Sequence, residues 1–233
     1  MKTVTVNLNT EQYPQQLAHA LGRRAHGQLD CRGNLELLRT PGVGFSGSRN
    51  ASAKGLEQAD TYARQLAREG WTIVSGHASG VDVTSHRAAL AAGGTTILVL
   101  PHGMDQFRLR PELRPVWDWS RALVVSPYEP QAAFKPFRAI QRNEVIAGLS
   151  QGVVVFEAGN LGGTLNTGLT TLKLKRPLFA AVYEAMPPTA TGNRLLIARG
   201  ARPLETDRES PAHHTHRMAE VMEQNATWMA ASA

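Results

Sequence analysis

Cysteine is almost absent from this 233-residue chain, in which Cys31 is the only one. A single cysteine excludes an internal disulfide and a cysteine-rich metal site. No apolar run approaches the ~18–20 residues that a membrane helix needs, and residues 1–5 lack the apolar core of a signal peptide. The sequence therefore predicts a cytoplasmic protein that does not enter a membrane.

The chain also lacks the motifs of common cofactor sites. It has neither the Walker lysine pattern nor a G-x-G-x-x-G followed by a distal acid, which is the pattern of NAD sites. His213, His214 and His216 cluster near the C-terminus, but a metal site needs preformed geometry and more ligands. A solvated polar segment is the better interpretation of these histidines. We therefore expect no metal ion and no cofactor.

Acidic residues are fewer than basic ones. The chain carries 25 Lys and Arg against 19 Asp and Glu, which gives a formal charge of +6 and a pI of ≈ 9.9. This balance favours an anionic partner, with nucleic acid as the first candidate. The excess is modest, and a plain basic surface explains it equally well.

From Leu35 onward, short β-branched runs alternate with helical periodicity. Alternation of this kind predicts an α/β protein whose mostly parallel sheet has helices on both faces. Near-continuous apolar runs such as residues 96–100 and 153–156 fit strands buried on both sides. The expected strands cover residues 43–46, 71–75, 95–100, 122–126, 152–157 and 177–182. The expected helices include residues 56–67, 81–92, 140–149 and 164–174.

The length of the chain suits one sizeable domain with little left for a second. Residues 1–34 are polar, and we expect a lead-in with one or two short helices. Residues 35–206 would form the core. Residues 207–233 would form a polar tail, in which Met218, Val221 and Met222 predict a short amphipathic helix.

Three glycine-rich turns follow predicted strands, at residues 46–49, 75–80 and 158–164. In a parallel sheet all three lie at the carboxyl edge, where ligands bind. Glycine lets the backbone approach a ligand closely, and free amides at a helix start donate to oxyanions. Ordinary helix N-caps are the alternative role for Ser79, Asp82 and Thr164. The predicted phosphate-binding residues of the turns are Gly47, Ser48, Arg49, Gly76, Ser79, Gly80, Gly162, Gly163 and Thr164.

A second cluster combines aromatic and basic residues just before or within the expected helix at 140–149. Its members are Phe134, Lys135, Phe137, Arg138, Arg142 and Asn143. Cations neutralise phosphates and aromatic faces stack on bases, so the combination is typical of nucleic-acid binders. Taken alone, Phe134 and Phe137 are better explained as core anchors of the helix, with the cations on its solvated face.

Three further polar residues stand near the turns. Asp82 and His86 are four residues apart on an expected helix, so they can meet on one face. A structural hydrogen bond that braces the turn is a better interpretation of this pair than a catalytic or metal site. Glu157 ends a strand at the crevice edge, where its carboxylate suits either a ribose hydroxyl or the amides of a turn.

Seven short motifs occur in order over residues 11–204. They are Tyr13-Pro14 with Leu17, residues 33–38, Gly47-Ser48-Arg49, residues 75–82 with His86, Arg142-Asn143 with residues 146–150, Glu157-Ala158 with residues 163–167, and residues 192–197 with Gly200-Ala201. In this order they resemble the motifs of the DprA/Smf family of DNA-processing proteins. The resemblance implies a Rossmann-like, doubly wound domain that binds single-stranded DNA. It also implies a homodimer that helps to load RecA in natural transformation.

The resemblance further implies a role for individual residues. Arg49 would contact a phosphate, and the glycines of the three turns would shape the pocket. Residues that would line the path of the strand are Lys135, Phe137, Arg142 and Asn143. The chain departs from the family pattern at Ser79, where arginine is common, and at Gly162 and Gly168, which replace serine and alanine. We expect it to correspond to the family core alone, without the helical N-terminal domain and the C-terminal winged helix.

Two other functions occur on the same fold. A nucleotide sensor would hold one small nucleotide in the crevice instead of threading a polymer. A phosphoribohydrolase of the lysine-decarboxylase-like group would use a P-G-G-x-G-T-x-x-E turn, which residues 162–164 resemble. However, Thr167 and Gly168 stand near where the catalytic glutamate would be needed, and no proline precedes the glycines. We therefore expect a DNA-binding protein rather than an enzyme.

Overall fold

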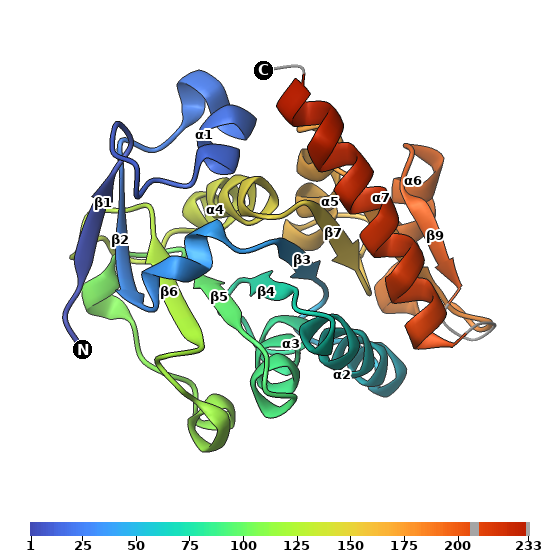
Figure 1. Cartoon of the computed structure of the whole chain (residues 1–233). Helices are drawn as coiled ribbons and strands as arrows, with labels where there is room; N and C mark the ends of the chain where they lie inside the picture. The colour runs from blue at the N-terminus through green and yellow to red at the C-terminus, as the bar shows by residue number, and fades with distance from the viewer. Residues whose placement is uncertain (206–209, 232–233) are drawn as a thin grey trace.

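The computed structural model describes residues 1–205 and 210–231 (Figure 1). Its strands are β1 (Val4–Asn7), β2 (Gln28–Gly33), β3 (Gly42–Ser46), β4 (Thr72–Ser75), β5 (Thr96–Val99), β6 (Ala122–Ser126), β7 (Gly152–Val155), β8 (Leu178–Val182) and β9 (Arg202–Glu205). Within the described residues these nine strands form one sheet in the order β1-β2-β6-β5-β4-β3-β7-β8-β9. Every pair from β6 to β9 is parallel, whereas β1–β2 and β2–β6 are antiparallel. The prediction of a mostly parallel, Rossmann-like sheet is confirmed, and all six predicted strands are present.

Helices connect the parallel strands. The α-helices are α1 (Gln15–Leu21), α2 (Ala53–Arg68), α3 (Val81–Ala91), α4 (Pro136–Leu149), α5 (Gly163–Lys173), α6 (Thr191–Ala198) and α7 (Pro211–Ala231). The 3-10 helices are η1 (Gly22–Arg24), η2 (Leu35–Arg39), η3 (Met104–Gln106), η4 (Pro111–Val116) and η5 (Pro188–Ala190). Each of the four helices expected between strands is present as α2, α3, α4 or α5.

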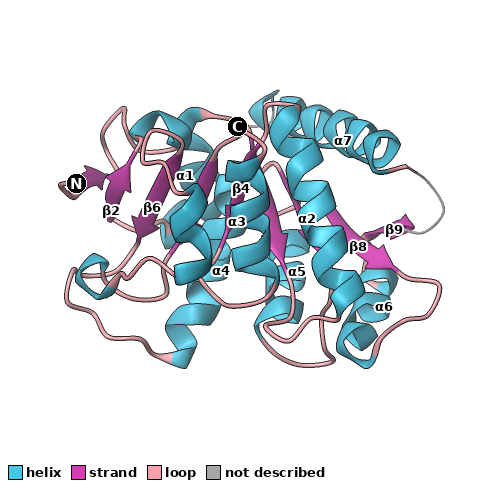
Figure 2. Cartoon of the chain, turned by 90° about the horizontal axis from the view of Figure 1, so that it is seen from below, coloured by secondary structure: helices cyan, strands magenta, loops and turns pink. Residues whose placement is uncertain are grey.

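Helices lie on both faces of the sheet (Figure 2), and each face carries its own core. On one face α1, α4, α5 and α6 pack against residues such as Val153 and Val155, and on the other α2, α3 and α7 pack against Val154 and Phe156. Successive strand residues point to opposite faces, so a central strand covered on both sides must be apolar throughout. This requirement explains the near-continuous apolar runs in the sequence.

Local sequence explains where two helices of the site begin. Ser52 caps α2, because its Oγ accepts a hydrogen bond from the backbone N–H of Gly55 at 3.1 Å. Pro136 starts α4 at a position where its missing N–H costs no helical hydrogen bond, and Lys135 before it is extended. Because α2 follows β3 and α4 follows β6 in the chain, the N-termini of both helices lie at the carboxyl edge of the sheet.

The first 34 residues contain the short helices that we expected, α1 and η1, and also two strands that we did not predict. β2 pairs directly with β6, and its residues Leu29 and Cys31 are buried in the core. The strand was missed because Gln28, Asp30 and Gly33 have low β propensity. Antiparallel pairing with β1 and β6 compensates for that weakness.

The C-terminal helix is longer than predicted. α7 extends over 21 residues, Pro211–Ala231, and its Met218 and Met222 are buried in the same core as α2. Residues 206–209 and 232–233 of the expected core end and polar tail lie outside the described residues. In the part of the chain that the structure describes, no helix combines the length and the apolar character needed to span a membrane.

Candidate nucleic-acid interface

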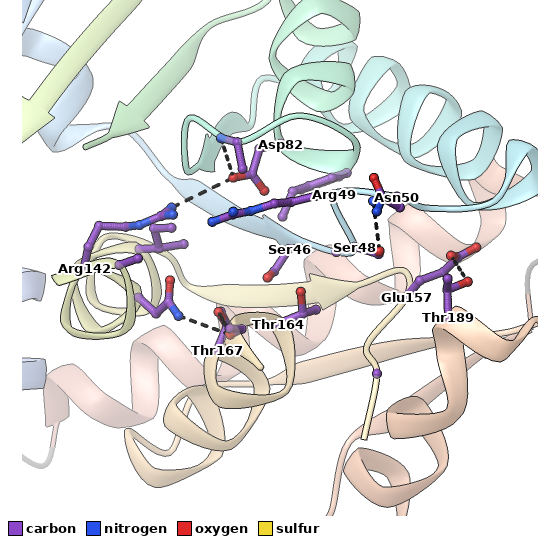
Figure 3. Close-up of a pocket in the computed structure, with 18 of the residues that line it drawn as sticks. Ser46, Ser48, Arg49, Asn50, Asp82, Arg142, Glu157, Thr164, Thr167 and Thr189 are labelled. Carbon is purple, nitrogen blue, oxygen red and sulfur yellow. Dashed lines mark hydrogen bonds and ion pairs between the residues drawn. The ribbon is translucent and has the colours of Figure 1, made fainter. Parts of the chain in front are cut away.

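The three glycine turns lie side by side at the carboxyl ends of β4, β3 and β7, which are neighbours in the sheet. From β3, the chain adds β4, β5 and β6 on one side, and later β7, β8 and β9 on the other. The boundary between β3 and β7 is thus the topological switch point at which open α/β sheets bind ligands. A pocket of ≈ 400 Å³ occupies this place (Figure 3). The predicted residues that line it are Gly47, Ser48, Arg49, Asp82, Arg142, Asn143, Glu157, Gly163 and Thr164.

Arg49 stands exposed directly after the turn that follows β3. Among the described residues it forms no hydrogen bond and no ion pair, and the carboxylates of Asp82 and Glu157 interact with other groups instead. The turn itself is tightly packed, because a Cβ at Gly47 would overlap the side chain of Val81. The guanidinium group is therefore held at the pocket by a rigid turn, with its donors available to a ligand.

Arg142 approaches the same point from α4. Figure 3 shows the side chains of Arg49 and Arg142 pointing toward one another beside Asp82. Arg142 is buried and its Nη1 lies 4.0 Å from Oδ2 of Asp82, while its Nε has no hydrogen-bond partner among the described residues. Burial lowers the pKa of Arg142, an effect that the Asp82 carboxylate opposes. Two converging guanidinium groups, one of them incompletely paired, form a site for an anion.

Asp82 is buried at the start of α3, and its Oδ2 accepts a hydrogen bond from the backbone N–H of Ala78 at 3.2 Å. Burial raises the pKa of this carboxyl group, whereas the charge of Arg142 lowers it. The pair with Arg142 is therefore loose and poorly solvated. An anionic ligand beside Arg142 would compensate for this incomplete pairing.

The buried imidazole ring of His86 hydrogen-bonds to the backbone of the second turn. Its Nε2 lies 2.7 Å from the carbonyl oxygen of Gly76 and its Nδ1 lies 2.6 Å from Oγ1 of Thr96. Burial lowers the pKa of His86 to about 4, so the ring is neutral at pH 7. A carbonyl oxygen only accepts, so Nε2 carries the proton of the neutral ring and donates it to Gly76. Asp82 thus hydrogen-bonds to the backbone N–H of Ala78, whereas His86 hydrogen-bonds to the carbonyl oxygen of Gly76 in the same turn.

The second turn also contacts the first one. Gly80 has a φ of 76°, and a Cβ at this position would overlap the carbonyl oxygen of Ser48. Ser79 faces a neighbouring pocket and not the main one. The close approach of the two turns fixes Arg49 relative to α3.

Glu157 stands directly before the third turn and lines the same pocket. Its carboxylate accepts hydrogen bonds from the backbone N–H and Oγ of Ser52 and from Oγ1 of Thr189. Glu157 therefore ties the end of β7 to α2 and η5. Residues 160–163 of the turn are exposed: Gly162 has a φ of 111°, and a Cβ at Gly162 or Gly163 would meet nothing within 4 Å.

Lys135, Phe137 and Arg138 lie outside the main pocket, at the exposed start of α4. Phe134 and Phe137 are 51% and 52% exposed, so the alternative that they are core anchors is wrong. The Nζ of Lys135 lies 6.0 Å from the ring centre of Phe137, and the guanidinium group of Arg138 lies 5.4 Å from that of Tyr128. The start of α4 thus presents aromatic faces and cations together to solvent.

Arg110 was not predicted as a site residue from the sequence. A second pocket of ≈ 320 Å³ shares Arg49 and Arg142 with the main one and is also lined by Phe134 and Arg110. The Nε of Arg110 donates a hydrogen bond to the carbonyl oxygen of His77 at 3.0 Å. A third pocket of ≈ 420 Å³ continues from it past Arg108, Arg110 and Arg114. We call these three adjoining pockets the basic groove. The spacing of Arg108, Arg110 and Arg114 was the available signal, but no glycine turn marks it.

The matches of this chain to known proteins are consistent with this geometry. The family model of DNA recombination-mediator protein A matches residues 4–214. The chain belongs to this family. It is 32% identical to DNA processing protein DprA of Bacillus subtilis over 200 residues, which are 85% of this chain. It is 36% identical to DNA processing protein DprA of Streptococcus pneumoniae over 176 residues, which are 75% of this chain. It spans 67% and 62% of the lengths of these two relatives.

Solved structures agree with the family. The DprA structure from Streptococcus pneumoniae matches with a TM-score of 0.78 and 33% identity, and the match covers 88% of this chain and 71% of that one. The Helicobacter pylori DprA described for its single-stranded DNA binding mode has the same fold, with a TM-score of 0.78 at 22% identity and coverage of 94% and 97%. A molybdenum cofactor binding protein from Rippkaea orientalis shares the fold alone, with a TM-score of 0.55 at 21% identity and coverage of 79% and 98%.

Proposed function

We propose that this member of the family binds single-stranded DNA along the basic groove, as part of DNA processing and recombination. The observation that carries the proposal is the convergence of Arg49 and Arg142 on one point at the switch of the sheet. A planar guanidinium group binds a phosphate with two hydrogen bonds and stays charged at every relevant pH. A phosphodiester group placed there would complete the pairing of Arg142.

The length of the groove favours a strand over a single phosphate. From the Arg49–Arg142 pocket the cationic lining continues to Arg110 and Arg114, while Phe134 offers an aromatic face beside it. A positive groove with exposed aromatic rings is the usual arrangement of single-strand binders, because every base has a face that can stack. A duplex keeps its base faces covered, so it would use only the cations.

A nucleotide sensor remains the second candidate, because a pocket of ≈ 400 Å³ closed at one end by Glu157 suits a single nucleotide. The direct experiment compares oligo-dT, duplex of equal length and a panel of mononucleotides by fluorescence anisotropy or calorimetry at several salt concentrations. Affinity for oligo-dT should exceed that for duplex and fall steeply as salt rises. A flat salt response, tighter binding to duplex, or preference for a mononucleotide would reject strand binding.

Assembly and partners form a further part of the proposal. Relatives of this family are DNA processing proteins, and we infer that this chain acts as a homodimer that aligns two DNA sites and cooperates with RecA. Light scattering with and without oligo-dT tests the dimer, since a 25.3 kDa particle under both conditions would exclude it. Pull-down of RecA by the DNA-bound protein, against an Arg49→Ala variant, tests the partner.

A further inference from the structure

Leu161 is the most exposed of the large apolar side chains in the described residues, with 89% of its surface accessible. Single exposed apolar residues are common on protein surfaces. Leu161, however, lines the pocket that contains Arg49, in a turn whose neighbouring residues are Asn160 and Gly162. Because so little of its surface is covered, Leu161 makes little apolar contact within the described chain and is available to a ligand in this pocket.

A second apolar surface lies close to this turn. The side-chain Nδ2 of Asn143 donates to the carbonyl oxygen of Gly163 at 3.2 Å, which ties the turn to α4. Ile140 and Phe137 precede Asn143 on that helix at intervals of three residues, so the three share one side of it. Ile140 is 48% exposed and Phe137 is 52% exposed. The helix that Asn143 ties to the turn therefore also carries exposed apolar side chains, outside the main pocket.

Cations stand beside these apolar side chains. Arg49 lines the same pocket as Leu161, and Lys135 is exposed next to Phe137. A ligand that suits this surface combines negative charge with flat apolar faces, and the phosphates and bases of a single strand provide both. An apolar peptide segment would leave the cations unpaired, so a nucleic acid is the better match.

We propose that Leu161 packs on the face of a nucleobase of the bound strand, while the adjoining phosphate binds Arg49. This inference rests on the proposed function and adds a base contact to it. Gly159 and Gly162 on either side of Leu161 allow the turn to adjust its backbone to the base. The contact is independent of sequence, because it uses the face of the base and not its edge.

The test compares Leu161→Ser with Leu161→Met on oligo-dT and on an abasic strand of the same length. Leu161→Ser should weaken binding to oligo-dT roughly three- to tenfold at every salt concentration, because about one side chain of apolar contact is lost and no charge. Leu161→Met should bind like the unchanged protein. On the abasic strand the unchanged protein and Leu161→Ser should bind equally. Val4→Ser, at a 39% exposed position on β1, is the matched control and should have no effect.

The outcomes separate the two proposals. Equal losses on oligo-dT and on the abasic strand, or no loss on oligo-dT, would overturn the base contact while leaving strand binding intact. Failure of the unchanged protein to bind oligo-dT would overturn both. A change in salt dependence for Leu161→Ser would also count against a base contact, since removal of a leucine leaves the number of neutralised phosphates unchanged.

Discussion

The guanidinium group of Arg142 lies so close to the Cα of Gly76 that a Cβ at position 76 would overlap its Nη1 and also Oδ2 of Asp82. Glycine at this place is therefore a packing requirement of the Arg142–Asp82 pair. The second turn, α3 and α4 meet at this one contact. The geometry of the anion site depends on a residue that has no side chain.

Gly76→Ala should displace Arg142 and leave Asp82 buried without its partner. We expect a loss of roughly 1–3 kcal/mol in the free energy of unfolding, measured by urea denaturation, together with weaker binding of oligo-dT by the remaining folded protein. Gly27→Ala is the matched control, because a Cβ at Gly27 meets nothing within 4 Å and its φ is not positive. Equal stability of the two variants would show that Arg142 has room to move.

Arg49→Ala should separate binding from stability. Arg49 is exposed and unpaired among the described residues, so the free energy of unfolding should stay within about 0.5 kcal/mol of its original value. Binding of oligo-dT should weaken by roughly 1–3 kcal/mol, as expected for a charge-assisted hydrogen bond to phosphate, and its salt dependence should become shallower. Arg68→Ala, at the exposed far end of α2, is the control. A variant that melts early but binds normally when folded would contradict the role of Arg49.

Much of the fold could be predicted because the central strands are nearly continuous apolar runs, as in Val153-Val154-Val155-Phe156. The strands of the N-terminal segment could not, since Gln28–Gly33 gains its strand conformation from pairing with β1 and β6 and not from its own residues. The turns of the site were visible as glycine clusters. The pairing of Asp82 with Arg142 was not, because it joins helices that are far apart in the sequence.

The remaining differences between the predicted and the observed site concern which side chains are buried and which are exposed. Sequence patterns could not show that Arg142 is buried and Phe137 exposed, because helical periodicity alone fits either arrangement of that segment. Arg110 was missed for another reason. It precedes the 3-10 helix η4, in a segment with no strand or glycine signal, and reaches the groove through its hydrogen bond to His77.

The free energy of unfolding should decrease as the pH is lowered from 6.5 to about 4, because of His86. Its pKa is lowered from 6.5 to about 4, mainly by burial, so in this range the unfolded chain binds a proton that the folded protein does not. The contribution is complete above pH 6.5 and is lost as the pH falls, by up to roughly 3 kcal/mol. Asp82, whose pKa is raised, acts in the opposite direction. Urea denaturation across this range should give a flatter profile for His86→Gln, and parallel profiles would exclude His86 as the cause.

Arg110 distinguishes a bound strand from a bound nucleotide. It lines the second and third pockets of the basic groove but not the main pocket, so a mononucleotide seated in the main pocket does not reach it, whereas a strand that extends along the groove does. Arg110→Ala should therefore leave the affinity for a mononucleotide unchanged and weaken binding of oligo-dT by roughly 1–3 kcal/mol, with a shallower salt dependence. Calorimetry with dTMP and with oligo-dT of increasing length measures both effects, with Arg68→Ala as the control. The effect of Arg110→Ala should appear only once the oligonucleotide is long enough to span from Arg49 to Arg110. If the effect is the same for dTMP as for the longest strand, or is absent from both, the strand does not follow the basic groove.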